Sequence, residues 1–399
     1  MKPKAIVYNC SYNGLSIIQE LSRHGVDCIA MDCFRGIGTF SRYARYEKCP
    51  DPRYQEKAFA EKLYQVCSEQ KEKPVLIPTN DEWALVTAKY KSKLSGVAHV
   101  CTAGYDTVRT MLDKDAFYQI GAKRGYMTPE TWGREHLESL NDDLFPVVAK
   151  AKYKSIPGNG SARLNKELEE NRLVVLEDRR QLETYIEEHQ YLLPHLVFQE
   201  YIRGDSDTMY TVGIYTDRNH EVQALFTGRK IRGYPPDIGD NIVGQSWKVP
   251  IELIENTRRI IKEMEFSGIA EFEYKQDSEN SRYRLIEINP RPWSWIGITP
   301  HCGVNIPLVA YNDLCGFPYQ PQIDTQQYDS IRYVKAYQDF LNCTLRYRFN
   351  QPRWVMSPLQ WYRETKAHTN VYAELNRKDY PVSLLSIGYV IAKMIRKDL

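Results

Sequence analysis

The sequence predicts an α/β protein that opens with a doubly wound parallel sheet and continues into α+β parts. Residues 4–8 form a short apolar run, residues 15–24 have helical spacing that ends at Gly25, and residues 26–31 are apolar again. This β-turn-α-β order is typical of a parallel sheet. Further along, residues 267–291 hold two alternating runs around a polar turn at 277–281, which predicts an antiparallel hairpin.

Composition bounds the class of protein. The chain has 399 residues, enough for two or three domains, and a net charge of +2, which gives no global attraction to nucleic acid. Its nine cysteines are odd in number and scattered, so we expect reduced thiols in a cytoplasmic protein. We expect neither a leader, because the first residues run straight into a strand, nor a spanning helix, because no apolar run reaches about 18 residues.

The predicted hairpin carries a group of oxygen ligands. Side chains two apart on a strand share a face, so Glu271 and Glu273 face together, as do Glu287 and Asn289. Carboxylate and amide oxygens suit Mg²⁺, which keeps phosphate and water oxygens in its shell. Arg291 follows and could hold a phosphoryl or carboxylate oxygen. The alternative is an edge hairpin whose acids are solvated.

Other polar positions follow apolar strands. The turn at residues 9–14 is not G-x-G-x-x-G, yet it lies where ligands often bind. Residues 79–82 follow the strand at 74–78, and either contact a substrate or cap the next helix through Thr79 or Asn80. Lys150 ends the strand at 145–150, where burial is unfavourable unless it meets an anion. The Gly/Ser loop at 155–161 could bring backbone amides to phosphates or be a plain surface loop.

The hairpin resembles the metal-binding end of the ATP-grasp superfamily, whose members activate a carboxylate with ATP. Glu273 is followed by E-I-N-P-R at 287–291, and Asp113-Lys114, Lys150 and the loop at 155–161 come earlier in that family's order. Within the superfamily, residues 1 to about 320 are most similar to the predicted ATP-dependent carboligases that include D-aspartate ligase. The shared features are S-R-Y at 41–43, P-T-N-D-E at 78–82, the cations near residue 230, and L-x-E-I-N-P-R-P-W at 285–293. Two departures are Asn9 or Cys10 in place of an early glycine, and Ala151 in place of a proline.

The resemblance implies an ATP-grasp fold with an N-terminal domain at 1–108, an ATP-grasp domain at 109–320 with a lid at about 122–198, and a basic extension at 321–399. It implies ATP and Mg²⁺ or Mn²⁺ as cofactors, and an ADP-forming ligase that joins a carboxylate to an amine, expected to be an amino acid, through an acyl phosphate. The carboxylate would be a small molecule or a lipid-linked cell-envelope or surface-polysaccharide precursor, and no nucleic acid would take part. Two alternatives stay open: a regulatory module with a degenerate nucleotide site, and an ATP-grasp carboxylase or thiol ligase.

The resemblance also assigns roles to single residues. Metal ligands would be Glu273, Glu287 and Asn289. Nucleotide contacts would come from Lys114, Lys150, Ser155, Gly158, Gly160, Ser161, Glu200, Tyr201, Ile202 and Asp207, with Asp205 as the alternative to Asp207 at the ribose. Catalytic cations would be Arg291, Lys230 and Arg232. Substrate contacts would be Asn13, Asn80, Asp81 and Trp293, although a tryptophan is more often part of the core.

The C-terminal part is basic and aromatic. Residues 335–399 contain eleven Lys or Arg against five Asp or Glu, with tryptophans and tyrosines interleaved. Residues 384–395 are apolar and too short to span a bilayer. As a helix they would place Leu384, Ile387, Ile391 and Met394 on one face. We expect either peripheral contact with the anionic inner face of a membrane, or packing on the core or in a homodimer.

Overall fold

The N-terminal part is a parallel sheet covered on both faces. The computed structural model describes residues 2–153, 162–236, 239–328, 330–350 and 352–395. The first sheet has the order β3-β2-β1-β4-β5, and every neighbouring pair is parallel. Its strands are β1 (Ala5–Tyr8), β2 (Cys28–Asp32), β3 (Ala44–Lys48), β4 (Val75–Pro78) and β5 (His99–Val100). Its helices are α1 (Tyr12–Arg23), α2 (Glu56–Ser68), α3 (Asp81–Lys89), α4 (Lys91–Leu94) and α5 (Tyr105–Leu112).

The first sheet is stabilised by the burial of its central strands. β1, β2 and β4 are buried along their whole length, as apolar runs in a doubly covered sheet should be. On one side Phe59 of α2 and Trp83 of α3 pack edge to face, and on the other side Leu15 and Ile18 of α1 enter the largest core cluster. Both faces are therefore shielded, and the carboxyl ends of the strands are left to build a site.

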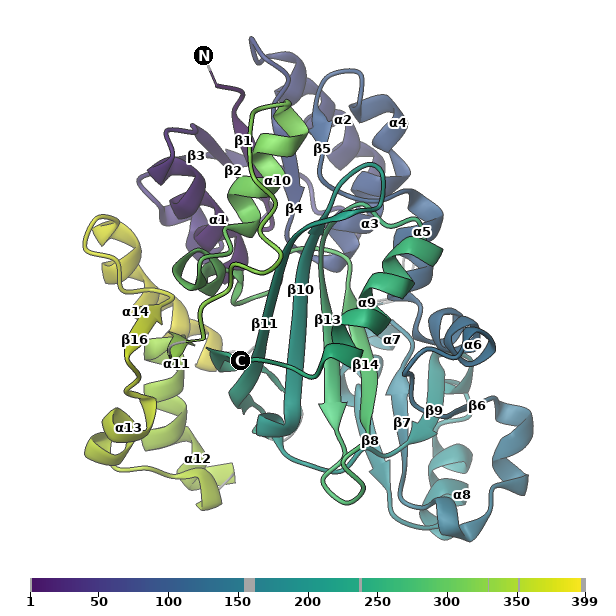
Figure 1. Ribbon diagram of the computed structural model, residues 1–399. Coiled ribbons are helices and arrows are strands. Elements are labelled where there is room, and N and C mark those ends of the chain that lie inside the picture. The colour runs from purple at the N-terminus through teal and green to yellow at the C-terminus, as the bar shows by residue number, and fades with distance from the viewer. Residues whose placement is uncertain (1, 154–161, 237–238, 329, 351, 396–399) are drawn as a thin grey trace.

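A second, smaller sheet forms the region predicted as a lid, at the lower right in Figure 1. Its order is β6-β9-β7-β8, with antiparallel neighbours. The strands are β6 (Thr131–Trp132), β7 (Val147–Ala151), β8 (Leu173–Leu176) and β9 (Leu196–Glu200). The helices are α6 (Lys114–Arg124), α7 (Ala162–Glu170) and α8 (Arg179–Glu188). Asp113 caps α6 by accepting a hydrogen bond from the backbone N–H of Ala116 at 3.1 Å.

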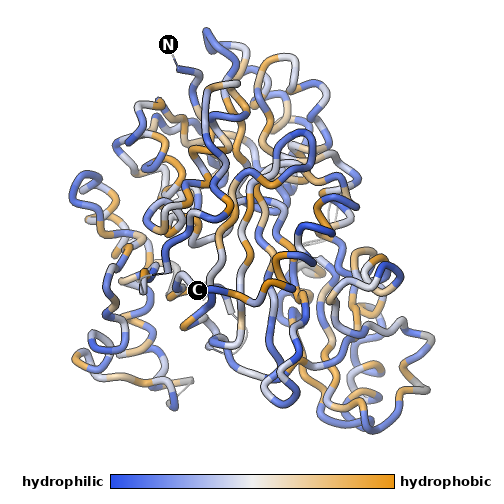
Figure 2. Tube along the Cα trace, viewed as in Figure 1, coloured by the Kyte–Doolittle hydropathy of each residue, from blue (hydrophilic) through white to orange (hydrophobic). Residues whose placement is uncertain are grey.

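The third sheet is the centre of the molecule and includes the predicted hairpin. Its order is β14-β13-β10-β11-β12-β15-β16. The first five of these strands in chain order are β10 (Met209–Thr216), β11 (Val222–Tyr234), β12 (Asp240–Ser246), β13 (Gly268–Gln276) and β14 (Tyr283–Asn289). Helix α9 (Ile251–Glu263) packs on one face, while α1 and α10 (Ile306–Cys315) meet the other. Figure 2 shows hydrophobic residues concentrated along these central strands.

The C-terminal segment is joined to this sheet. β15 (Ile331–Val334) pairs antiparallel with β12, and β16 (Thr369–Tyr372) pairs parallel with β15. The helices are α11 (Ala336–Leu341), α12 (Tyr347–Asn350), α13 (Pro358–Thr365) and α14 (Tyr380–Ile395), with a π-helical turn at Asn342–Arg346. Residues 331–372 therefore add two strands to the central sheet, where the sequence predicted a separate extension after residue 320.

The same segment also packs back on the first domain. Asp379, just before α14, accepts hydrogen bonds from the Ser41 hydroxyl at 2.6 Å and from Gln19 at 2.9 Å. Buried Val382 and Val390 turn one face of α14 inward. Among the described residues, no helix is both long and apolar enough to cross a membrane. Packing on the core, one of the two expectations for this segment, is thus observed for one side of α14.

Candidate active site

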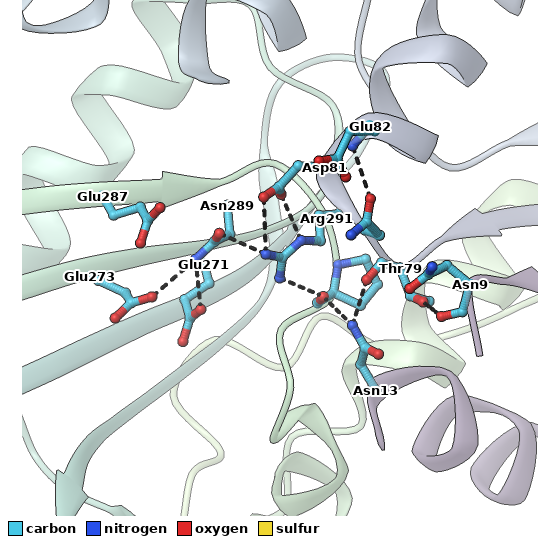
Figure 3. Close-up of polar contacts among 12 residues, drawn as sticks. Asn9, Asn13, Thr79, Asp81, Glu82, Glu271, Glu273, Glu287, Asn289 and Arg291 are labelled. Carbon is cyan, nitrogen blue, oxygen red and sulfur yellow. Dashed lines mark hydrogen bonds and ion pairs between the residues drawn. The ribbon is translucent and has the colours of Figure 1, made fainter. Parts of the chain in front are cut away.

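The hairpin of β13 and β14 places four oxygen-bearing side chains together. Its register sets Glu271 opposite Asn289 and Glu273 opposite Glu287. Because directly opposed residues share a face, all four lie on one side of the sheet, as Figure 3 shows. Glu271, Glu273 and Asn289 are buried, while Glu287, on the edge strand, keeps 22% of its side chain exposed. We call these four residues the acid face.

Asn289 and Arg291 tie the acid face to the first domain. The Asn289 amide donates to Glu271 Oε2 and to Glu273 Oε1, both at 3.0 Å. Its Oδ1 accepts a hydrogen bond from Arg291 Nη2 at 2.8 Å, and Arg291 Nε donates to Asp81 Oδ1 at 2.7 Å. Asp81 begins α3, directly after strand β4. This series of hydrogen bonds, from the glutamates through Asn289 and Arg291 to Asp81, therefore links the third sheet to the first (Figure 3).

Two of the three carboxylates of the acid face lie beside lysines. Lys230, on β11, is buried, and its Nζ lies 2.7 Å from Glu273 Oε2. Burial lowers the pKa of Lys230, but Glu273 and then Glu271 more than offset this, so the pKa is raised. Lys114, the first residue of α6, has its Nζ 3.4 Å from Glu287 Oε1. The two carboxylates predicted as metal ligands thus each have a lysine beside them.

Glu271 belongs to this set although the predicted metal ligands did not include it. It accepts hydrogen bonds from the Thr211 hydroxyl at 3.1 Å and from Asn289. Burial, and next the charge of Glu273, raises the pKa of Glu271 to about 8. The sequence contained the signal for including Glu271, because it lies two residues before Glu273 on the predicted strand and so shares its face.

The acid face has the donor chemistry of a Mg²⁺ site. Its donors are carboxylate and amide oxygens, which hard divalent cations prefer. Among the described residues, no group of three or more His, Cys, Asp or Glu side chains is arranged to hold a metal ion. Lys230 lies 2.7 Å from Glu273 and Lys114 lies 3.4 Å from Glu287, so both carboxylates are paired with ammonium groups in this structure. The metal roles of Glu273, Glu287 and Asn289 stay predictions.

A cleft of about 440 Å³ lies between the second and third sheets, beside the acid face. Its lining is Val148, Lys150, Leu173, Glu200, Tyr201, Ile202, Met209, Lys275 and Ile286. Four of these, Lys150 and the run 200–202, are residues that the resemblance assigns to a nucleotide. Burial, and next the charge of Lys114, lowers the pKa of Lys150 to about 8. A partly buried lysine that lies near other lysines is a candidate partner for an anionic ligand.

The other residues predicted for the nucleotide are held in different ways. Glu200 Oε1 accepts from Arg284 Nε at 2.6 Å and from the backbone N–H of Glu130 at 3.0 Å. Asp207 is exposed in a short 3₁₀ turn, as is Asp205 just before it. The choice between them at a ribose stays a prediction. Ser155, Gly158, Gly160 and Ser161 lie outside the described residues.

Arg232 and Trp293 both make buried contacts within the fold. Arg232 forms a bidentate pair with Asp339 of α11, at 3.0 and 2.6 Å, and also donates to the Thr365 hydroxyl. This buried contact anchors the C-terminal segment and does not support a catalytic role for Arg232. Trp293 is fully buried, stacks on Phe226 at 6.1 Å between ring centroids, and fills the space above Gly213. Its placement fits the core-packing alternative rather than contact with a substrate.

The predicted polar residues of the first domain shape the turns around the junction. Asn13 donates to the carbonyls of Thr79, at 2.6 Å, and Pro292, at 3.0 Å. Asn80 caps α3 by accepting from the backbone N–H of Glu82 at 3.0 Å, which is the capping alternative. Asn9 has a φ of 61°, a left-handed conformation that asparagine tolerates better than most residues. Asn9 therefore meets the backbone requirement of the glycine expected in this turn.

The comparisons with known proteins agree with this geometry. A family model described as "ATP-grasp in the biosynthetic pathway with Ter operon" matches residues 196–337. D-aspartate ligase from Enterococcus faecium (strain Aus0004) is 25% identical over 237 residues, 56% of this chain and 54% of that protein. The chain thus spans about half the length of this curated relative.

Solved structures match over most of the chain. N5-carboxyaminoimidazole synthetase from Staphylococcus aureus, complexed with ADP, has a TM-score of 0.63 at 14% identity, covering 88% of this chain and 87% of that one. Biotin carboxylase from Campylobacter jejuni has a TM-score of 0.62 at 14% identity, covering 82% and 74%. L-amino acid ligase from Bacillus licheniformis has a TM-score of 0.55 at 17% identity, covering 79% and 75%.

The chain has the ATP-grasp fold. The matches confirm the predicted fold class and the resemblance to ATP-grasp carboxylate–amine ligases. The second and third sheets both contribute residues to the cleft, and the first sheet comes before them in the chain.

Proposed function

We propose that this ATP-grasp protein is an ADP-forming ligase that joins a carboxylate to an amine through an acyl phosphate. The observation that carries the proposal is the position of the acid face directly beside the cleft of Lys150. Lys114 lowers the pKa of Lys150 and Glu287 raises it, so the residues of the cleft and of the acid face lie close enough to interact electrostatically. Such a site suits a polyphosphate that is bound at one end by a lysine and at the other by acids through metal ions.

The chemistry requires this combination of groups. A carboxylate does not react with an amine at neutral pH, because oxide is a poor leaving group. Transfer of the γ-phosphoryl group breaks its bond to ADP and forms an acyl phosphate. The amine nitrogen then bonds to the acyl carbon, inorganic phosphate leaves, and the amine proton passes to solvent. The barrier is mainly electrostatic, because several negative oxygens must approach one another.

Residues of this chain supply the required charges. Lys150, Lys114 and Arg291 would neutralise phosphate and carboxylate oxygens. Glu273, Glu287 and Asn289 would hold Mg²⁺, which would supply positive charge to stabilise the phosphate oxygens. Mn²⁺ has the same preference for oxygen ligands and would serve as an alternative ion. Glu200, with the backbone of Tyr201 and Ile202, would receive the base, and Asp207 the ribose.

The relatives support this reading without deciding the substrates. Two of the named relatives are ligases of amino acids, D-aspartate ligase and L-amino acid ligase. A third is a synthetase complexed with ADP. Carboxylases also appear among the structural matches, so an ATP-grasp carboxylase is the alternative reaction, and a nucleotide-binding regulatory module is the alternative without turnover.

A phosphate-release screen with ATP and Mg²⁺ tests the proposal. The screen crosses a panel of amino acids with a panel of carboxylates, and chromatography identifies the nucleotide product. We expect ADP and phosphate that depend on both substrates. AMP and pyrophosphate would contradict the acyl-phosphate route, turnover with bicarbonate as the carboxylate would indicate a carboxylase, and nucleotide binding without turnover in any combination would favour the regulatory module.

We also propose that the C-terminal helix brings the enzyme to an anionic membrane surface, where a lipid-linked cell-envelope precursor would be its carboxylate. The outer face of α14 exposes Leu384 at 71%, with Ile387 at 45% and Ile391 at 44%. The side chain of Met394, predicted on the same face, lies outside the described side chains. Exposed Arg377 and Lys378 precede the helix, and each cation near an anionic surface adds about 1 kcal/mol.

Co-sedimentation with vesicles tests this location. The parent chain and an Ile387→Ser, Ile391→Ser double variant are each mixed with anionic and with zwitterionic vesicles. We expect salt-sensitive binding of the parent to anionic vesicles only, and loss of binding in the variant. Equal recovery of both chains in the supernatant would contradict the proposal, and a dimer in light scattering that the variant abolishes would assign the face to a second copy.

A further inference from the structure

A second cavity lies along the edge strand β14 and is lined by both Glu287 and Ile288 of that strand. Helices α3 and α5 of the first domain, the start of α6 and strand β14 surround it. Its wall is mainly apolar and comprises Leu85, Tyr105, Met111, Leu112, Phe117, Tyr118 and Ile288. The Tyr118 hydroxyl donates to the carbonyl of Ile286, whose side chain lines the nucleotide cleft. Strand β14 therefore contributes residues to both cavities.

The polar residues of this second cavity have a defined chemistry. Three carboxylates, Asp81, Glu82 and Glu287, line it together with two cations, Arg109 and Lys114. Glu287 and Lys114 also belong to the site of the proposed reaction. Arg109 lies 3.7 Å from Asp106 with both side chains exposed, a surface pairing that is worth little in water. The cavity thus combines an apolar wall with groups that suit an ammonium and a carboxylate.

These features disfavour a second nucleotide as the natural occupant. A polyphosphate needs several cations or backbone amides, whereas carboxylates outnumber cations around this cavity. They equally disfavour a ligand with an acidic side chain, because a carboxylate placed against Leu85, Phe117 and Ile288 would lose its hydration without gaining a partner. An apolar group loses nothing there and gains burial.

We propose that this cavity binds the amine substrate, and that this substrate is an amino acid with a bulky apolar side chain. The inference rests on the proposed ligase function and narrows its substrate class. The ammonium group faces Glu82, the α-carboxylate faces Arg109, and the side chain lies against Leu85 and Phe117. The matched D-aspartate ligase is named for an acidic amino acid, so the proposal sets this chain apart from that relative.

Calorimetric titration of the full-length protein in Mg²⁺ and ADP tests the inference without a known carboxylate. Leucine, methionine and phenylalanine are compared with aspartate and lysine, each as both enantiomers. We expect the apolar amino acids to bind at least about 10-fold more tightly than aspartate. Equal or tighter binding of aspartate or lysine would overturn the inference.

Variants of the cavity sharpen the test. Leu85→Trp fills the apolar wall, and Leu359→Trp, on the exposed face of α13, is its matched control. We expect Leu85→Trp to lose at least about 10-fold in leucine affinity while ADP affinity stays at the parent value. If Leu85→Trp does not fold, Glu82→Gln should produce a similar loss for leucine through the ammonium.

The outcomes separate the inference from the proposed function. Parent affinity for leucine in both cavity variants would overturn the inference while leaving nucleotide binding intact. Failure of the parent to bind ADP at all would overturn the proposed function, and the inference with it.

Discussion

Lys150 offers a substitution whose effects on stability and on binding should have opposite signs. Within the described part of the chain, its ammonium makes no ion pair, although Lys114 and Lys275 lie near enough to lower its pKa further. Folding therefore places a charge beside other charges of the same sign. Lys150→Met keeps the length of the side chain and removes the charge, so the folded protein loses an electrostatic penalty and the nucleotide loses a partner.

The magnitude follows from the pKa. The pKa of Lys150 falls from an ordinary 10.5 to about 8, and each unit corresponds to about 1.4 kcal/mol. The full shift would amount to about 3 kcal/mol, and partial exposure of the side chain reduces this to about 1–2 kcal/mol. The unfolded chain holds this proton to higher pH than the folded one. The penalty is therefore complete below about pH 8 and disappears as the pH rises through 10.5.

Urea unfolding at pH 7 and at pH 10, with titration of ADP and Mg²⁺, measures both effects. We expect Lys150→Met to gain about 1–2 kcal/mol in unfolding free energy at pH 7, to gain little at pH 10, and to bind ADP about 10- to 100-fold more weakly. Lys57→Met, at an exposed lysine of α2, is the matched control and should change neither quantity. A variant that is less stable at pH 7 and binds ADP as the parent does would refute the reasoning.

Three further substitutions test the acid face and its supports. Glu287→Gln should lower the rate of ADP formation at least about 100-fold with an unchanged melting temperature, whereas Glu255→Gln, exposed on α9, should leave the rate alone. Asp81→Asn leaves the buried guanidinium of Arg291 without its carboxylate, and should lower the unfolding free energy by about 3 kcal/mol in urea titration. Arg232→Leu breaks the buried pair with α11, and should release the C-terminal segment to limited proteolysis while sparing ADP binding.

Local patterns were sufficient to predict the parallel first sheet and the acid face, whereas the ATP-grasp fold was implied by the family resemblance. Apolar runs with helices between them gave the parallel first sheet, since β1, β2 and β4 are buried on both faces. The period of two along a strand placed Glu271 with Glu273 and Glu287 with Asn289, and the observed register joins the two pairs. Both predictions depend on neighbours within one hairpin or one βαβ unit, where sequence spacing determines geometry.

The positions of some predicted site residues depend on contacts with residues far apart in the sequence, and these contacts could not be predicted. Lys230 and Arg232 look alike in sequence, but a bulge in β11 separates them in register. Lys230 then meets Glu273, while Arg232 meets Asp339, which is 107 residues away. Trp293 was equally ambiguous until Phe226 and the bare backbone of Gly213 gave it a place in the core. Each of these contacts depends on long-range strand pairing, which local sequence patterns do not predict.

The charges of the site also suggest how nucleotide and metal should enter it. Glu273 and Glu287 each have a lysine beside them, and burying such acids without partners would cost several kcal/mol. A metal ion alone would have to displace Lys230 and Lys114 and leave two cations without anions. A polyphosphate alone would bring negative charge towards the acids. Under the proposed roles of these residues, a nucleotide that arrives with its metal would satisfy both sets at once, because its phosphates would pair with the lysines and the metal with the carboxylates. We therefore infer that nucleotide and metal enter together, because the lysines and carboxylates of the site then all keep partners of opposite charge.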